Sequence, residues 1–260
     1  MAIVTFTTDF GSRDYYAGQF KGTLLSHCPD LTIVDISHHV TPFNIVEAAF
    51  TFKNAWQSFP EGSIHLLHVY NREDDHREML YLHHRGHHFI GPNNGLFSLI
   101  FEEVLQPVQL LEDEKELPFQ SRFAVAKAVQ HIVNQIPPDK WSRPCTALEQ
   151  RINLRPVIYP SRIVGFVIHL DIYENAITNI SRELFQQVGQ GRPFSLIFKG
   201  HRPVREISHY YQDVPVGEIV CLFNAAGLLE IAVNMGKAHS LFSLGLDDPV
   251  QIDFSTPSQE

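Results

Sequence analysis

Two carboxylates, Asp9 and Asp14, follow an apolar run at the start of the chain. The run, residues 3–6, has the length and the β-branched residues of a buried strand, and Gly11 ends it. Both side chains therefore emerge at the carboxyl end of the first predicted strand, the edge at which open α/β sheets bind ligands. An Asp there can accept two hydrogen bonds from a ribose diol without a metal. The alternative is that both residues cap the helix predicted to begin near Tyr15.

Strand patterns alternate with helix patterns through the first half of the chain. This alternation predicts an α/β domain, residues 1–155, with a mostly parallel sheet and helices on both faces. Apolar residues at three- and four-residue spacing predict the helices, and short β-rich runs predict the strands. The predicted strands are 3–6, 31–36, 64–69, 79–82, 88–91 and 108–111, and the predicted helices are 16–28, 45–59 and 121–136.

The second half of the chain has a different pattern. The proline-rich segment 137–160 is interpreted as a linker. Short β-rich runs separated by Gly, Pro and Asn turns follow it, with one possible short helix at 182–187 and a hairpin turn at 224–227. The predicted strands are 162–170, 195–199, 218–224 and 228–233. This pattern predicts a small all-β barrel domain, residues 161–260.

The composition argues against several classes of partner. The net charge is -9 and no basic stripe is present, so the sequence does not predict a nucleic-acid partner. No apolar stretch approaches about 18 residues, and the chain enters a strand at once, so neither a membrane span nor a signal peptide is expected. Cys28, Cys145 and Cys221 lie far apart and are interpreted as reduced thiols of a cytoplasmic protein.

The 15 histidines raise the question of a metal site. His83-His84 and His87-His88 flank Arg85-Gly86, which predicts an exposed hairpin tip. Neighbouring side chains of a strand point to opposite faces, so this spacing does not favour a tetrahedral site. His65 and His68 are expected to pack at strand ends. We predict no metal, with a two-histidine metal hydrolase as the alternative.

Five segments, in this order and spacing, resemble one family. They are Thr8-Asp9-Phe10-Gly11 with Asp14; Val34-Asp35-Ile36-Ser37-His38 with Pro42-Phe43; Gly91-Pro92-Asn93-Asn94-Gly95-Leu96; Asp171-Ile172-Tyr173-Glu174-Asn175 with Thr178-Asn179-Ile180; and Leu229-Glu230-Ile231-Ala232-Val233-Asn234. The chain is similar here to the S-adenosyl-L-methionine (SAM) hydroxide adenosyltransferases, or SAM hydrolases, relatives of fluorinase and chlorinase. The resemblance runs from Ile3 to about residue 250. It implies an N-terminal α/β domain, a C-terminal barrel and a homotrimer with active sites between subunits.

The resemblance also implies a substrate site for SAM that needs no further cofactor. The Asp9 position holds the ribose hydroxyls in this family. The positions of Asp14, Asp171 and Ser121 are similar to those that hold the amino-acid end of SAM or line the reaction site. Asn175 resembles a position on the adenine side. The implied substrate-binding residues are Asp9, Asp14, Phe43, Asn93, Asp171, Asn175 and Tyr211.

The chain departs from the family at the residues that surround the attacking water. The hydrolases place an Asp, an Arg and a His there. In this chain Asn71 occupies the Asp position, Arg77 or Glu78 the Arg position, and Gln120, followed by Ser121, the His position. Asn and Gln can orient a water but cannot accept its proton at neutral pH. Positioning alone can still supply several kcal/mol, about 7–11 in favourable cases.

The sequence therefore predicts an enzyme that cleaves SAM by attack of water at the ribose C5′, giving adenosine and methionine. The predicted catalytic set is Asn71, Arg77, Gln120 and Ser121. Residues 74–76 could supply a replacement acid–base set, and a solvated loop is the alternative. Two other functions stay open. One is a SAM- or adenosine-binding protein without turnover. The other is a halide-dependent SAM halogenase, which the Ser121 position favours.

Overall fold

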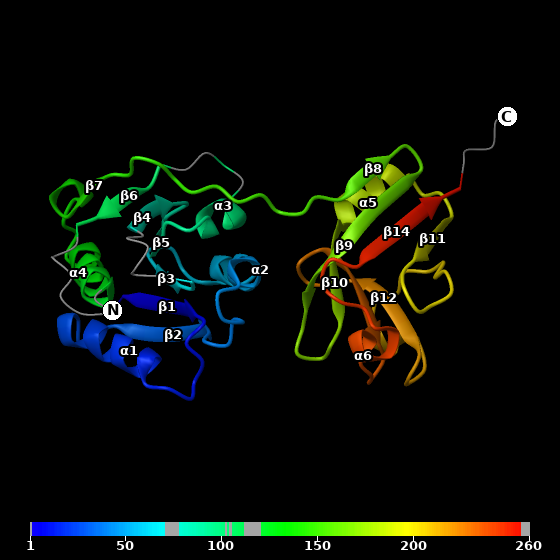
Figure 1. The fold of residues 1–260 in the computed structure, drawn as a ribbon, viewed down its shortest axis with the longest axis horizontal. Coiled ribbons are helices and arrows are strands. Elements are labelled where there is room, and N and C mark those ends of the chain that lie inside the picture. The colour runs from blue at the N-terminus through cyan, green and yellow to red at the C-terminus, as the bar shows by residue number, and fades with distance from the viewer. Residues whose placement is uncertain (1, 71–77, 102, 104–105, 112–120, 256–260) are drawn as a thin grey trace. The chain divides into compact units, whose positions relative to one another are not determined.

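The computed structural model describes residues 2–70, 78–101, 103, 106–111 and 121–255. The chain divides into two compact units, Met1–Asn153 and Leu154–Glu260. Each unit has a sheet of its own (Figure 1). Among the described residues, no helix combines the length and the apolar character that crossing a membrane would require.

The first unit is built on a seven-stranded mixed sheet with the order β2-β1-β3-β5-β4-β6-β7. Strands β2, β1, β3 and β5 are parallel to one another, as predicted. The pairs β5–β4, β4–β6 and β6–β7 are antiparallel, so the prediction of a mostly parallel sheet is correct for one half of the sheet only. The strands are β1 (Ile3–Thr8), β2 (Thr32–Ser37), β3 (Ile64–His68), β4 (Met79–His84), β5 (His87–Pro92), β6 (Val108–Leu110) and β7 (Ser142–Pro144).

A two-residue turn explains why the parallel arrangement ends at β5. Arg85 and Gly86 connect β4 to β5, and both have positive φ, 48° and 76°. Turns with two left-handed central residues match the twist of antiparallel strands. The turn therefore makes β4 and β5 a hairpin, which confirms the predicted hairpin. His83 is exposed at its end, whereas His87 is buried.

Helices cover both faces of this sheet, as predicted (Figure 1). On β1, Val4 and Phe6 contribute to a core that includes buried residues of α1 and α4. A second core includes Leu67 of β3 and buried residues of α2 and α3. Successive side chains of a strand point to opposite faces of the sheet, so the sheet contributes to an apolar core on each face. The helices are α1 (Tyr16–His27), α2 (Ile45–Lys53), α3 (Leu96–Ile100) and α4 (Ser121–Val133), with short 3-10 turns η1 (Trp56–Ser58) and η3 (Pro138–Lys140).

The interpretation of 137–160 as a linker is wrong for most of its length. Its first part contains η3 and β7, and β7 pairs with β6 at the edge of the sheet. The prolines do not prevent this pairing because an edge strand needs hydrogen bonds on one side only. Residues 145–153 belong to the first unit as well.

The second unit is an antiparallel barrel-like sheet with the order β11-β14-β9-β10-β13-β12, and β8 pairs with β9. Segment 204–208 bridges the two edge strands: Val204 exchanges two backbone hydrogen bonds with Leu196 of β11, and the Ser208 N–H donates to the Cys221 carbonyl at 2.8 Å. The sheet encloses an apolar core. The strands are β8 (Val157–Tyr159), β9 (Arg162–Leu170), β10 (Ala176–Ser181), β11 (Phe194–Ile197), β12 (Ile219–Phe223), β13 (Leu228–Val233) and β14 (Pro249–Phe254), and the helices are α5 (Arg182–Gly189), η4 (Tyr211–Asp213) and α6 (Ala238–Phe242).

Candidate functional site

Asp9, directly after β1, joins two other loops of the first unit. Its Oδ2 accepts hydrogen bonds from the backbone N–H of Phe43 at 2.9 Å and of Tyr70 at 3.2 Å. Phe43 and Tyr70 both have positive φ, 68° and 49°. Such a backbone costs a non-glycine residue of order 1–3 kcal/mol and persists where its surroundings hold it. Within the described part of the chain both contacts fall on Oδ2, so Oδ1 keeps its capacity to accept from a ligand hydroxyl.

The alternative that Asp9 and Asp14 cap α1 is wrong. The N-cap of α1 is Tyr15, and no side chain caps the helix there. Asp14 lies in the exposed segment before the helix. Asp9 instead binds loops that follow β3 and precede α2. Asp9 therefore connects two loops at the carboxyl edge of the sheet. This is the edge at which its position after β1 predicted a ligand site.

His38 contacts both ends of the loop that contains Asp9. Its Nδ1 lies 2.7 Å from the Thr8 hydroxyl, and its carbonyl accepts from the Gly11 N–H at 2.6 Å. The Thr8 hydroxyl in turn accepts from the Phe10 N–H at 3.3 Å. Burial lowers the pKa of His38, against the opposing effect of Asp35 at 3.1 Å. A neutral imidazole therefore holds the turn that presents Asp9.

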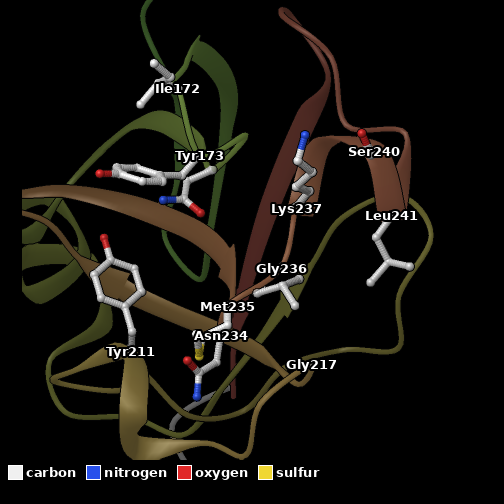
Figure 2. Close-up of a pocket in the computed structure, with 12 residues that line it drawn as sticks. Ile172, Tyr173, Tyr211, Gly217, Asn234, Met235, Gly236, Lys237, Ser240 and Leu241 are labelled. Atoms are coloured by element: carbon white, nitrogen blue, oxygen red, sulfur yellow. The ribbon is translucent and has the colours of Figure 1, made fainter.

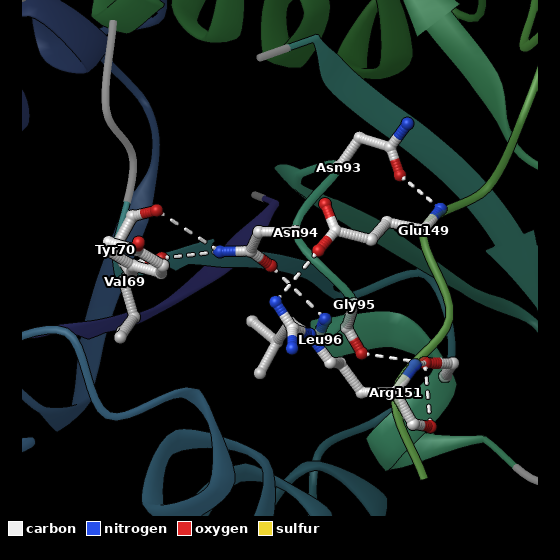
Figure 3. A network of polar contacts seen from close by, with 9 residues as sticks. Val69, Tyr70, Asn93, Asn94, Gly95, Leu96, Glu149 and Arg151 are labelled. Carbon is white, nitrogen blue, oxygen red and sulfur yellow. Dashed lines mark hydrogen bonds and ion pairs between the residues drawn. The ribbon is translucent and has the colours of Figure 1, made fainter. Parts of the chain in front are cut away.

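Asn94, in the segment after β5, holds the Tyr70 loop (Figure 3). The Asn94 amide donates to the carbonyls of Val69 at 2.9 Å and Tyr70 at 3.3 Å, and its oxygen accepts from the Leu96 N–H at 3.1 Å. Asn94 is buried, so these contacts satisfy an amide that would be costly to leave unpaired. Asn94 and Tyr70 were not among the predicted site residues, although they adjoin the predicted Asn93 and Asn71.

Asn93, which was predicted to bind substrate, uses its amide to hold the segment that returns from β7. Its nitrogen donates to the Ala147 carbonyl, and its oxygen accepts from the Glu149 N–H, both at 2.8 Å (Figure 3). Phe43 is 66% exposed, and its ring lies 5.7 Å from that of Tyr70. These two rings therefore form an apolar wall beside Asp9.

Ser121, the first residue of α4, faces the end of β3. Its hydroxyl lies 3.2 Å from Nε2 of His68, and both side chains are buried. The other predicted catalytic residues, Asn71, Arg77 and Gln120, lie outside the described residues. Sequence reasoning placed His68 in the packing of a strand end. Its position at the carboxyl end of a predicted strand was the signal that could have selected it.

In the second unit, Asp171 organises the loop between β9 and β10. Its Oδ1 accepts from the backbone N–H of Tyr173 at 2.9 Å and of Asn175 at 2.8 Å, and its Oδ2 accepts from the Asn175 amide at 3.0 Å. The two predicted residues Asp171 and Asn175 are thus in direct contact. Asp171 fixes the orientation of the Asn175 side chain.

A cavity of about 1090 Å³ lies beside this loop, and Figure 2 shows Tyr173 and Tyr211 on one side of it and Lys237 on the other. The Tyr211 hydroxyl donates to the buried carboxylate of Glu230 at 2.7 Å. Burial raises the pKa of Tyr211, and the hydrogen bond to Glu230 raises it further. The cavity is lined by Ile172, Tyr173, Asn175, Tyr211, Gly217, Val233, Asn234, Met235, Gly236, Lys237, Ser240 and Leu241. Two of the predicted residues, Asn175 and Tyr211, therefore share one aromatic, mostly apolar cavity.

The histidines do not gather into a metal site in the part of the chain that the structure describes. In the described segments, no three His, Cys, Asp or Glu side chains are grouped as they would be around a metal ion. His65 and His87 instead form a hydrogen-bonded pair at 3.0 Å in the core of the first unit.

Comparison with known proteins assigns the family of both units. The model of the SAM hydroxide adenosyltransferase N-terminal domain matches residues 4–142, and the model of its C-terminal domain matches residues 165–251. The chain belongs to the SAM hydroxide adenosyltransferase family. The resemblance found in the sequence is thereby confirmed.

Relatives of two kinds match this family member over nearly its whole length. A protein of Thermus thermophilus named (R)-S-adenosyl-L-methionine hydrolase is 30% identical, with 97% of this chain and 100% of the relative covered. A hydrolase of the same name from Methanocaldococcus jannaschii is 26% identical, over 96% and 95% of the two chains. A fluorinase of Nocardia brasiliensis is also 26% identical, over 96% of each chain.

A solved structure supports the fold of this SAM hydroxide adenosyltransferase. An uncharacterized conserved protein of Thermotoga maritima has a TM-score of 0.85 and 24% identity, over 97% of this chain and 100% of that one. At this identity the likeness concerns the fold alone.

Proposed function

We propose that this protein binds SAM and cleaves it by attack of water on the ribose C5′, giving adenosine and methionine. The observation that carries the proposal is the Asp9 carboxylate at the carboxyl edge of β1, held between two strained loops and keeping acceptor capacity on Oδ1. Membership of the family and the full-length match to relatives named as SAM hydrolases support the choice of SAM as substrate.

The proposed binding mode uses the first unit of one subunit and the second unit of a neighbouring subunit. Asp9 accepts from the ribose hydroxyls beside the Phe43–Tyr70 wall, and Asp14 receives the ammonium of the methionine end. The cavity with Asn175 and Tyr211 takes the adenine, because a purine needs an apolar slot and a few amide hydrogen bonds. Asp171 holds Asn175 in place for that contact.

The reaction needs little chemical activation. The sulfonium sulfur of SAM carries a positive charge and leaves as the neutral thioether of methionine, so a positioned water can displace it. We assign the positioning of that water to Ser121 together with Asn71, Arg77 and Gln120. Holding reactants in a productive geometry can lower a barrier by several kcal/mol, and no cofactor is assigned.

The assay that tests the proposal follows SAM and its products by liquid chromatography and mass spectrometry. Adenosine and methionine are expected in equal amounts, in excess of a control without enzyme and independent of chloride or fluoride. A 5′-halo-adenosine that requires the halide would instead identify a halogenase. SAM binding in calorimetry without any product would identify a binding protein without turnover.

We also propose that the protein is a homotrimer whose active sites lie between subunits. Several large apolar side chains around the barrel cavity are exposed, among them Ile172 at 91%, Met235 at 87% and Tyr173 at 72%. A contiguous apolar patch of this kind marks an interaction surface. A second copy of the chain would cover it and complete the SAM site.

Light scattering should therefore give three times the chain mass of 29.7 kDa. The double variant Ile172→Asp, Met235→Asp is expected to reduce that mass, because it places charges in an apolar interface. Ile152→Asp, at an equally exposed residue of the first unit, is the matched control and should stay trimeric. A wild-type protein that has the mass of one chain at all concentrations would contradict the proposal.

A further inference from the structure

His68 ends β3 at the edge of the sheet where Asp9 follows β1. In the parallel pairing of β1 with β3, His68 lies opposite Thr8, the residue before Asp9. Two residues further along, the Tyr70 N–H donates to the Asp9 carboxylate. An imidazole therefore lies at the carboxyl end of β3, beside the strand that positions the proposed ribose-binding residue.

Two phenylalanine rings pack against His68. Its ring lies 5.2 Å from that of Phe10 and 5.4 Å from that of Phe20, and only 4% of the residue is exposed. Nε2 lies 3.2 Å from the hydroxyl of Ser121, which is 2% exposed. The histidine and the serine thus form a buried polar contact between β3 and the start of α4.

We propose that His68 orients the Ser121 hydroxyl and receives, through it, the proton of the attacking water. This inference rests on the proposed hydrolysis of SAM. His68 would accept the proton that the amides of Asn71 and Gln120 cannot take, because an amide does not accept a proton at neutral pH. A neutral imidazole with an unprotonated Nε2 can accept one.

The water oxygen forms a bond to the ribose C5′ while the C5′–sulfur bond breaks. The electron pair of the broken bond goes to sulfur, and neutral methionine leaves. The water gives one proton to the Ser121 oxygen as the Ser121 hydroxyl proton moves to Nε2 of His68. The imidazolium then releases that proton to solvent. The sum is SAM plus water giving adenosine, methionine and one proton.

The segments around His68 carry other ionisable groups. Of the described residues, Asp9 follows the neighbouring strand β1, Tyr16 belongs to α1 and Arg122 to α4, and Tyr70 follows His68 on its own segment. The variants that test His68 therefore leave all four in place.

The experiment measures kcat for adenosine formation between pH 5 and pH 9, with calorimetry of SAM binding on the same samples. For wild-type enzyme, kcat is expected to fall as the pH drops and His68 becomes protonated. His68→Gln should lower kcat about tenfold at neutral pH, leave the SAM affinity within about twofold, and remove the acidic limb of the profile. Ser121→Ala should also remove the limb, because it breaks the path to His68.

His83→Gln is the matched control, because His83 is an exposed histidine in the hairpin of the same unit. Its rate and pH profile should equal those of the wild type. A His68→Gln or Ser121→Ala enzyme that keeps the wild-type acidic limb would overturn the inference while leaving SAM hydrolysis intact. A wild-type protein that forms no adenosine would instead reject the proposed function. Should His68→Gln fail to fold, Ser121→Ala, which removes one buried oxygen, decides the question.

Discussion

Replacement of Asp9 by alanine is expected to weaken SAM binding on the order of 100-fold. The substitution removes the acceptor for the ribose hydroxyls and leaves the N–H groups of Phe43 and Tyr70 without their partner. Each lost partner costs about 1–3 kcal/mol, and about 1.4 kcal/mol corresponds to tenfold in affinity. The carboxylate helps to hold the left-handed backbones of Phe43 and Tyr70, so the Phe43–Tyr70 wall should loosen as well.

Isothermal titration calorimetry with SAM measures this loss directly. Asp9→Asn, which keeps the shape and one acceptor oxygen, should lie between the wild type and Asp9→Ala. Asp30→Ala, at an exposed Asp in the turn after α1, is the matched control and should bind as the wild type does. Unchanged affinity in Asp9→Ala would show that the ribose does not bind at the edge of β1.

The first unit is expected to lose stability between pH 7 and pH 5 because of a buried histidine. His65 has no exposed surface; its Nδ1 lies 2.7 Å from the Thr5 hydroxyl and its Nε2 lies 3.0 Å from Nδ1 of His87. The rings of Phe52 and Phe89 pack against it. Burial, followed by the charges of His87 and His88, lowers the pKa of His65 to about 3.

The direction of the effect follows from where the proton binds first. An unfolded histidine titrates near 6.5, about 3.5 units above the folded value, so acid protonates the unfolded chain first. The contribution of His65 to the unfolding free energy is complete above pH 6.5 and is lost as the pH falls from there toward 3. At about 1.4 kcal/mol per pH unit, the unfolding free energy should be about 2 kcal/mol smaller at pH 5 than at pH 7.

Urea unfolding at the two pH values, followed by tryptophan fluorescence, measures this change. Both tryptophans, Trp56 and Trp141, belong to the first unit, and the Trp56 ring lies 6.1 Å from that of His65. His65→Gln should be less stable at pH 7 and should show a flatter dependence on pH. His201→Gln, an exposed histidine of the barrel, should keep the wild-type dependence. Equal pH dependence in His65→Gln and wild type would contradict the assignment.

The sequence determined the local elements and the position of Asp9. Residues 3–6 are apolar and β-branched, and Gly11 and Asp9 follow them, so the strand and its carboxyl end can be recognised without knowledge of any partner. The Arg85-Gly86 turn can also be recognised from adjacent residues. Signals of this kind lie within a few residues of one another, which is the range over which side-chain periodicity and turn preferences act.

Only the tertiary structure decided which strands pair, because a β-rich run does not specify the direction of its neighbour. The antiparallel pairing of β4 with β6 and the entry of 142–144 into the sheet were therefore missed. The same holds for the contacts that complete the site. Asp9 meets Tyr70 across 61 positions, and His68 meets Ser121 across 53. These pairs form because separate strands end at one edge of the sheet, a consequence of long-range packing that no local pattern encodes.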